Sequence, residues 1–322
     1  MIQGKKRHEG KRNIRLDGIM GVIVGDALGC PVQFTERENL MKRGLVKGME
    51  GHGTYDMPPG TWTDDGSLTL ATLDSIRTLN TVDPDDIMTR FVGWYEEGEY
   101  TPFGEAFDIG NTCAKAIWCY EHGADIHTCG GTSERSNGNG SLMRIMPVCL
   151  YAYEKKLSEN EAVKIVHEIS GLTHNHLRSK MACGFYFFCI CAVLNGKGSL
   201  KERLQQGMDN GFAYYEKDSC YKEELSLFTR LKFLTLFAEL QASDIKSTGY
   251  VVDLLEAALW SLLNTESFEQ CLLKAVNLGD DSDTIGAIAG GVAGLFYGYD
   301  NIPGQWLQVI KRREWIEEMC CK

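Results

Sequence analysis

The chain has 322 residues, of which 43% are hydrophobic and 24% are charged, and its net charge is −11. This size and balance indicate a water-soluble globular protein with a substantial core and exclude a disordered chain. A chain of net negative charge also lacks the positive electrostatic potential on which nucleic-acid binding depends, and it is repelled by an anionic membrane surface. We therefore expect neither nucleic acid nor a membrane among its partners.

The first 15 residues are basic, and no apolar segment follows them at the distance of a signal peptide. We expect residues 1–15 to be a frayed start and residues 16–322 to form a single helical domain, because no repeat or linker divides them. Apolar residues recur with helical periodicity, and convincing period-two strands are missing. The sequence predicts helices over residues 16–28, 65–79, 84–96, 112–122, 140–155, 159–170, 176–194, 225–240, 250–263, 267–277, 284–297 and 305–318. The predicted fold class is all-α.

The cysteines and the most apolar segment both favour a compact core. Several of the 12 cysteines lie within predicted helices and no CxxC pair occurs, so we expect reduced cysteines packed as small apolar side chains in a cytoplasmic protein. Residues 181–194 form the most hydrophobic run, which is shorter than the roughly 20 residues that a spanning helix needs and predicts a buried core helix. Residues 285–295 place small residues every three or four positions, which lets neighbouring helix backbones approach closely.

Two short acidic blocks each open a predicted helix. The first is Thr63-Asp64-Asp65, and the second is Asp-Asp-Ser-Asp-Thr at residues 280–284. Helix capping ordinarily explains one such block. Two blocks supply more carboxylates than two caps need, and if the fold joins them the carboxylates repel one another unless they are protonated or bridged by cations. Every candidate ligand is an oxygen, so a bridging site would suit Mg²⁺ or Mn²⁺ rather than zinc.

A glycine-rich segment precedes one predicted helix. Residues 137–141, Asn-Gly-Asn-Gly-Ser, lead into a helix that we expect to start at Gly140. Backbone amides at such a start can bind an anion such as a pyrophosphate. Asn-Gly is also the commonest tight-turn dipeptide, and this segment alone favours a turn over an anion site.

Two more polar segments are typical of ordinary helix starts. Residues 173–176, Thr-His-Asn-His, would be capped by Thr173, and their two histidines cannot share a helix face. Residues 108–112, Asp-Ile-Gly-Asn-Thr, would be capped by Asn111 or Thr112. Neither segment alone indicates a function.

Taken in chain order, these segments resemble the ADP-ribosylglycohydrolase family, and most closely its bacterial members that remove ADP-ribose from an arginine of dinitrogenase reductase. The matching segments are residues 21–29, 63–65, 108–112, 138–144, 173–176 and 278–290. The resemblance implies an orthogonal multi-helix bundle of that family's type. It also implies a centre with two divalent metal ions, Mg²⁺ or Mn²⁺.

The resemblance assigns metal ligands by position. The implied ligands are Thr63, Asp64, Asp65, Asp281, Asp283 and Thr284. Asp280 is left out because relatives often have glycine there. Asp64 or Asp65 would orient the attacking water or carry a proton, and with Asp283 they form the expected catalytic set.

The implied substrate-binding residues come from three segments. Asn139 and Gly140 would lie in the loop that faces the ligand's phosphates, and His174 would contact the bound nucleotide. Asp108 and Asn111 match the segment that lies near the departing guanidinium in the arginine-specific relatives.

Two departures from the family's pattern bear on catalysis. Relatives usually have glutamate where this chain has Gln33, and an amide cannot take up a proton as a carboxylate can. If that glutamate assists catalysis, turnover here is slow or uses another carboxylate. Relatives also carry a second acid near Ser136, which leaves the preferred leaving group open.

The resemblance implies a metal-dependent hydrolase that cleaves the N-glycosidic bond between ADP-ribose and a modified protein side chain, most closely arginine. An ADP-ribosylated protein would be its substrate and ADP-ribose its product, and a monomer is the default state. Three alternatives stay open. The chain could be a catalytically weak ADP-ribose-binding protein, a hydrolase of another ADP-ribosyl linkage or of a phosphoester, or a structural protein with heavily capped helices.

Overall fold

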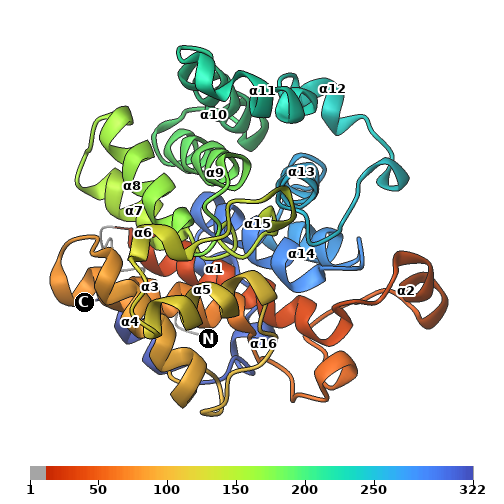
Figure 1. Ribbon diagram of the computed structural model, residues 1–322. Coiled ribbons are helices and arrows are strands. Elements are labelled where there is room, and N and C mark those ends of the chain that lie inside the picture. The colour runs from red at the N-terminus through yellow and green to blue at the C-terminus, as the bar shows by residue number, and fades with distance from the viewer. Residues whose placement is uncertain (1–11, 322) are drawn as a thin grey trace.

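The computed structural model describes residues 12–321, and within that range it is built from helices with short connections and isolated β-bridges (Figure 1). The helices are α1 Ile14–Gly29, α2 Arg37–Arg43, α3 Asp64–Leu79, α4 Pro84–Glu97, α5 Asn111–Glu121, α6 Ile126–Cys129, α7 Met146–Glu154, α8 Glu159–Gly171, α9 Leu177–Asn195, α10 Leu200–Tyr215, α11 Lys222–Leu225, α12 Leu234–Ala238, α13 Val251–Leu263, α14 Phe268–Val276, α15 Ser282–Tyr297, α16 Gly304–Leu307 and α17 Arg313–Cys321. The all-α prediction is confirmed.

The predicted basic start falls mostly outside the described residues, which begin at residue 12. From there the chain enters α1 at once. The Asn13 side chain accepts hydrogen bonds from the amides of Arg15 and Leu16 and so caps the helix, which begins two residues before the predicted position 16.

Three predicted helices have different bounds or are broken. Residues 225–240 form α11, a 3₁₀ segment and α12 instead of one helix. Their buried apolar residues recur every third position, which fits the three residues per turn of a 3₁₀ helix. These residues are Leu225, Phe228, Leu231, Leu234 and Phe237.

The single helix predicted over residues 305–318 is also wrong, because the structure has two helices there, α16 and α17, with a non-helical segment between them. Arg312 adopts a left-handed backbone conformation with φ of 49°, which cannot continue a helix. The Lys311 amide bonds instead to the Gly60 carbonyl. The prediction over residues 140–155 fails at its start, as described with the site below.

Three helices were not predicted at all, α2, α6 and α10. A capping box opens α10, in which the Ser199 hydroxyl accepts from the Glu202 amide and the Glu202 carboxylate accepts from the Ser199 amide. That Ser-x-x-Glu pattern is visible in the sequence and is the signal that could have identified this helix.

The pair α1 and α15 lies at the centre of the molecule (Figure 1). A Cβ added to Gly25 of α1 would lie 1.9 Å from the Gly286 carbonyl oxygen, and one added to Gly21 would lie 2.1 Å from that of Gly290. The two backbones therefore touch, as the small-residue pattern predicts. This contact brings the C-terminal half of α1 beside the start of α15.

Helix α9 is the predicted core helix over its apolar part. By length and composition alone it could cross a membrane, but 78% of its apolar window is buried inside the protein. It packs against α8, α10, α13 and α15. All 12 cysteines are free, in agreement with the predicted reduced state.

Candidate active site

The two acidic blocks meet in the folded chain. Thr63 Oγ1 lies 3.3 Å from Oδ2 of Asp65 and 3.3 Å from Oδ2 of Asp283. Thr284 Oγ1 donates to Asp65 Oδ2 at 3.2 Å. The start of α3 and the start of α15 thus share one polar cluster, which we call the inner cluster. It comprises Thr63, Asp64, Asp65, Asp281, Asp283 and Thr284.

Helix capping does not explain this cluster. Thr63 and Asp281 occupy the N-cap positions of α3 and α15, yet neither side chain accepts a hydrogen bond from its own helix. The carboxylate of Asp26, on α1, accepts the Thr63 amide at 2.9 Å and the Gly66 amide at 2.7 Å. Because Asp26 performs the capping of α3, the block's own carboxylates are left free for another partner.

The four carboxylates of the inner cluster are at most 9% exposed. Burial is the main cause that raises the pKa of Asp64, Asp65 and Asp283 well above the ordinary range, and the neighbouring carboxylates raise it further. Burial also raises the pKa of Asp281. Within residues 12–321 no arginine or lysine forms an ion pair with any of the four.

A buried oxygen of the inner cluster lacks a partner. Asp65 Oδ1 is buried and makes no hydrogen bond within the described part of the chain. An unpaired buried carboxylate oxygen is costly unless a cation binds it. The donor set of carboxylate and hydroxyl oxygens fits Mg²⁺ or Mn²⁺.

A cavity of about 370 Å³ opens beside the inner cluster, and Asp64, Asp281 and Thr284 line it. Thr63, Asp65 and Asp283 lie deeper and are not part of its wall. All five predicted substrate-binding residues line the cavity, namely Asp108, Asn111, Asn139, Gly140 and His174. The structure therefore gathers the sequence-predicted residues at one place.

Asp108 lines this cavity and has a left-handed backbone conformation, with φ of 57°. The Tyr55 hydroxyl donates to its Oδ1 at 2.5 Å. The predicted cap by Asn111 or Thr112 is wrong. The N-cap of α5 is Gly110, so both residues already belong to the first helical turn, and their side chains line the cavity.

The glycine loop does not open a helix. Helix α7 begins at Met146 rather than at Gly140, because the loop bonds across to residues 249–251 and Pro147 stands in the first turn of α7. The Asn139 amide donates to the Gly249 carbonyl, and the Asn139 side chain donates to Asp281 Oδ2 at 2.6 Å. The loop thereby connects the cavity wall to the inner cluster. Its turn agrees with the favoured interpretation, and the helix start that an anion site would need is absent from residues 137–141.

Gly140 packs directly against His174. A Cβ at Gly140 would lie 2.7 Å from Cε1 of the His174 ring. His174 is only 2% exposed, and burial, followed by the charge of Arg144, lowers its pKa to about 3. The predicted cap by Thr173 is wrong, because the cap of α9 is the side chain of His176.

Three residues of the site were not assigned a positive role from the sequence. Asp26 is fully buried, and burial raises its pKa to about 7. Its signal was a lone acid in the middle of an apolar helical segment. Tyr55 carried no such signal. Gln33, noted only as a departure, lines the cavity with a buried Oε1 that has no partner among the described residues.

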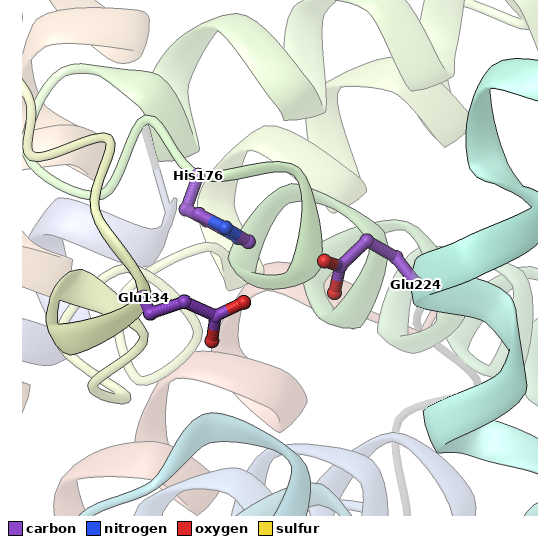
Figure 2. A group of neighbouring side chains, drawn as sticks. All are labelled: Glu134, His176 and Glu224. Atoms are coloured by element: carbon purple, nitrogen blue, oxygen red, sulfur yellow. The ribbon is translucent and has the colours of Figure 1, made fainter.

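A second group of metal-ligating side chains, which we call the outer cluster, comes from the 3₁₀ turn before the glycine loop, the start of α9 and α11 (Figure 2). Glu134, His176 and Glu224 point toward one another, and their ligand atoms lie within 4.8 Å of one another. Arg178 donates to Glu134 at 2.8 Å and to Glu224 at 2.7 Å. An internal cation therefore already pairs with both carboxylates, which makes this group the weaker candidate for a metal.

Comparisons with known proteins identify the family of this chain. A family model described as ADP-ribosylglycohydrolase matches residues 10–322. The chain is 32% identical to ADP-ribosylarginine hydrolase Tri1 of Serratia proteamaculans, over 94% of this chain and 76% of that protein. It is 31% identical to the ADP-ribosyl-[dinitrogen reductase] glycohydrolase of Rhodospirillum rubrum, over 91% of this chain and 88% of that protein. A solved structure described as an ADP-ribosylglycohydrolase-related protein complex superposes with a TM-score of 0.78 at 30% identity, over 96% of this chain and 95% of that one.

Proposed function

The chain belongs to the ADP-ribosylglycohydrolase family and is a glycosidic hydrolase, and from this premise we propose that it uses divalent metal ions to release ADP-ribose from modified arginine side chains. The observation that carries the proposal is the inner cluster, in which buried carboxylates from two distant segments meet and pair with no arginine or lysine of residues 12–321. An ADP-ribosylated protein is then the substrate and ADP-ribose the product.

The residues that would hold the ions are those of the inner cluster: Thr63, Asp64, Asp65, Asp281, Asp283 and Thr284. Bound Mg²⁺ or Mn²⁺ supplies Lewis acidity and lowers the pKa of water. Asp26 keeps Thr63 in place by accepting its amide and, at 3.1 Å, its hydroxyl.

Asp64 is the carboxylate best situated to handle the attacking water, because it belongs to the inner cluster and also lines the cavity. Burial, followed by the charges of Asp108 and Asp65, raises its pKa, which suits a carboxylate that takes up a proton from water. Asp65 and Asp283, which lie deeper, orient the cluster. Asp281 is fixed by its hydrogen bond from Asn139.

Asp108, in the wall of the cavity, supports arginine as the acceptor. A guanidinium is a planar cation that pairs well with a carboxylate. Asp108 presents one, fixed by the Tyr55 hydroxyl, and Asn111 lies beside it on the same wall. Asn139, Gly140 and His174 line the same cavity and would bind the ADP portion.

Gln33 favours one alternative, a protein that binds ADP-ribose and turns over slowly. Its amide cannot carry a proton, and its Oε1 has no partner in the described part of the chain. Gln33→Glu tests this alternative. A gain of about tenfold or more in turnover would indicate a weakened catalyst, since general acid–base groups contribute 10²–10⁴-fold. An unchanged rate would indicate that Gln33 is compatible with catalysis.

The cellular compartment and the oligomeric state are also part of the proposal. The free cysteines support a reducing compartment such as the cytoplasm. The cavity and the inner cluster are formed within one chain, which supports a monomer as the working unit.

The experiment that tests the function is product analysis on a panel of ADP-ribosylated side chains and simple phosphoesters. Each reaction is run with Mg²⁺, with Mn²⁺ and with EDTA. We expect ADP-ribose from modified arginine only when a metal is present. Full activity in EDTA would overturn the metal-based account, and release from serine alone would overturn the arginine assignment.

A further inference from the structure

Arg144 is a buried cation that forms no ion pair with a carboxylate among residues 12–321. It is 0% exposed, and its Nε and Nη1 atoms have no hydrogen-bond partner among residues 12–321. Its guanidinium lies 4.6 Å from the centre of the Phe91 ring, a contact that offsets only part of the desolvation cost. A charge retained at such a cost calls for a role beyond packing.

The one remaining terminal nitrogen of Arg144 starts a chain of hydrogen bonds. Arg144 Nη2 donates to Thr173 Oγ1 at 2.9 Å, and Thr173 Oγ1 lies 2.9 Å from His174 Nδ1. An arginine has no acceptor atom, so the Thr173 oxygen must accept from it. The Thr173 hydroxyl proton is then free to go to His174 Nδ1. The sulfur of Cys113, the other neighbour of this hydroxyl, is a much weaker acceptor.

The state of the His174 ring follows from this chain. Burial and the Arg144 charge keep the ring neutral at neutral pH, because they lower its pKa to about 3. A neutral imidazole carries one proton, and if Nδ1 accepts, that proton is on Nε2. A Cβ at Gly138 would lie 3.4 Å from Nε2, so this atom faces the glycine loop at the cavity wall. No described residue forms a hydrogen bond with Nε2.

We propose that Arg144 is a positioning residue which, through Thr173, holds His174 as the Nε2–H tautomer, so that the ring donates a hydrogen bond to an acceptor oxygen of a bound nucleoside diphosphate sugar. The unpaired charge of Arg144 adds positive potential behind the same wall, which favours a diphosphate in a chain of net charge −11. This inference rests on the proposed function for the identity of the ligand. The tautomer itself does not depend on it.

The test uses two conservative variants of the full-length protein. Thr173→Val keeps the shape of the side chain and removes the hydroxyl, whereas Thr173→Ser keeps the hydroxyl. Long-range ¹H–¹⁵N NMR spectra of the imidazole rings report which nitrogen carries the proton, and the His174 signal is identified by its loss in His174→Gln. Titration calorimetry with ADP-ribose measures binding separately from turnover.

We expect the Nε2–H pattern in the wild-type protein and in Thr173→Ser. In Thr173→Val we expect a mixed or Nδ1–H pattern, ADP-ribose binding about tenfold weaker, as for one lost hydrogen bond, and a KM effect larger than the kcat effect. A wild-type ring protonated on Nδ1 would overturn the proposal, even if Thr173→Val fails to fold. The proposal would also be overturned if Thr173→Val kept the wild-type tautomer and the wild-type affinity for ADP-ribose. Absence of ADP-ribose binding in the wild type, with the Nε2–H pattern present, would refute the ligand and the proposed function and leave the tautomer standing.

Discussion

The inner and outer clusters use the same side-chain chemistry with opposite charge balance. In the outer cluster, Arg178 donates to Glu134 and Glu224, and its hydrogen bonds lower the pKa of Glu134. In the inner cluster no arginine or lysine of the described chain forms an ion pair, and burial raises the carboxylate pKa values. The difference teaches that an internal cation separates a structural clamp from the site that we propose to bind a cation from solution.

The largest expected effect comes from neutralising the inner cluster. Asp65→Asn and Asp283→Asn each remove a charge without changing the side-chain shape, and we expect the release of ADP-ribose to fall by about 10³-fold or more because the metal site loses a ligand. The measurement is kcat/KM on modified arginine with saturating Mg²⁺.

The matched control is Glu224→Gln in the outer cluster. It removes a carboxylate that already has Arg178 as its partner, so we expect kcat/KM within about threefold of the wild type. A loss in this variant as large as that in Asp65→Asn would erase the distinction between the two clusters.

The second prediction concerns the helix contact that assembles the inner cluster. Gly25→Ala would place a Cβ 1.9 Å from the Gly286 carbonyl oxygen and would force α1 and α15 apart. We expect a loss of about 3 kcal/mol in the free energy of unfolding, since overpacking a tight interface costs about 1–3 kcal/mol or more. Urea unfolding measures it. Gly304→Ala is the control, because nothing lies within 4 Å of its added Cβ, and stability equal to the wild type in both variants would refute the contact.

The third prediction concerns the loss of stability in mild acid that buried His174 causes. The pKa of His174 is 6.5 in the unfolded chain and about 3 when folded, so neutral His174 contributes stability above pH 6.5 that is lost as the pH falls toward 3. Between pH 7 and pH 5 this loss is about 2 kcal/mol. Urea unfolding of the wild type and of His174→Gln at both pH values gives the difference. Equal pH dependence in the two proteins would contradict it.

The smallest effect is expected at the outer cluster. Arg178→Ala leaves Glu134 and Glu224 without their cation, and Tm should fall by about 2 °C, as for a partly exposed ion pair. Because His176 stays beside them, this variant should also gain a weak site for a divalent transition metal. Calorimetry with Zn²⁺ compares it with the wild type. Identical heats in the two proteins would show that an unpaired outer cluster does not attract a cation.

The sequence was sufficient for the fold class and for the segments that gather at the cavity, because helical periodicity and short motifs are local signals. It was insufficient where a distant segment decides the local structure. The start of the predicted helix at Gly140 fails because the loop bonds to Gly249, far along the chain. Capping, the ordinary explanation of the first acidic block, does not hold there because Asp26 of α1 caps α3 instead.

The same limit explains the residues that the sequence analysis did not assign. Tyr55 lies near Asp108 only through the path of the loop that precedes α3, and no spacing in the sequence encodes that approach. The 3₁₀ segment within residues 225–240 is a different case. The spacing of three between its apolar residues is visible in the sequence, but it was interpreted as the periodicity of an α-helix.

The most direct test of the central claim is a count of bound Mn²⁺ per chain by equilibrium dialysis. The wild type should bind two ions, the Glu134→Gln/Glu224→Gln variant should still bind two, and the Asp65→Asn/Asp283→Asn variant should bind none tightly. A wild type that takes up no Mn²⁺, or an inner-cluster variant that binds as the wild type does, would contradict the account.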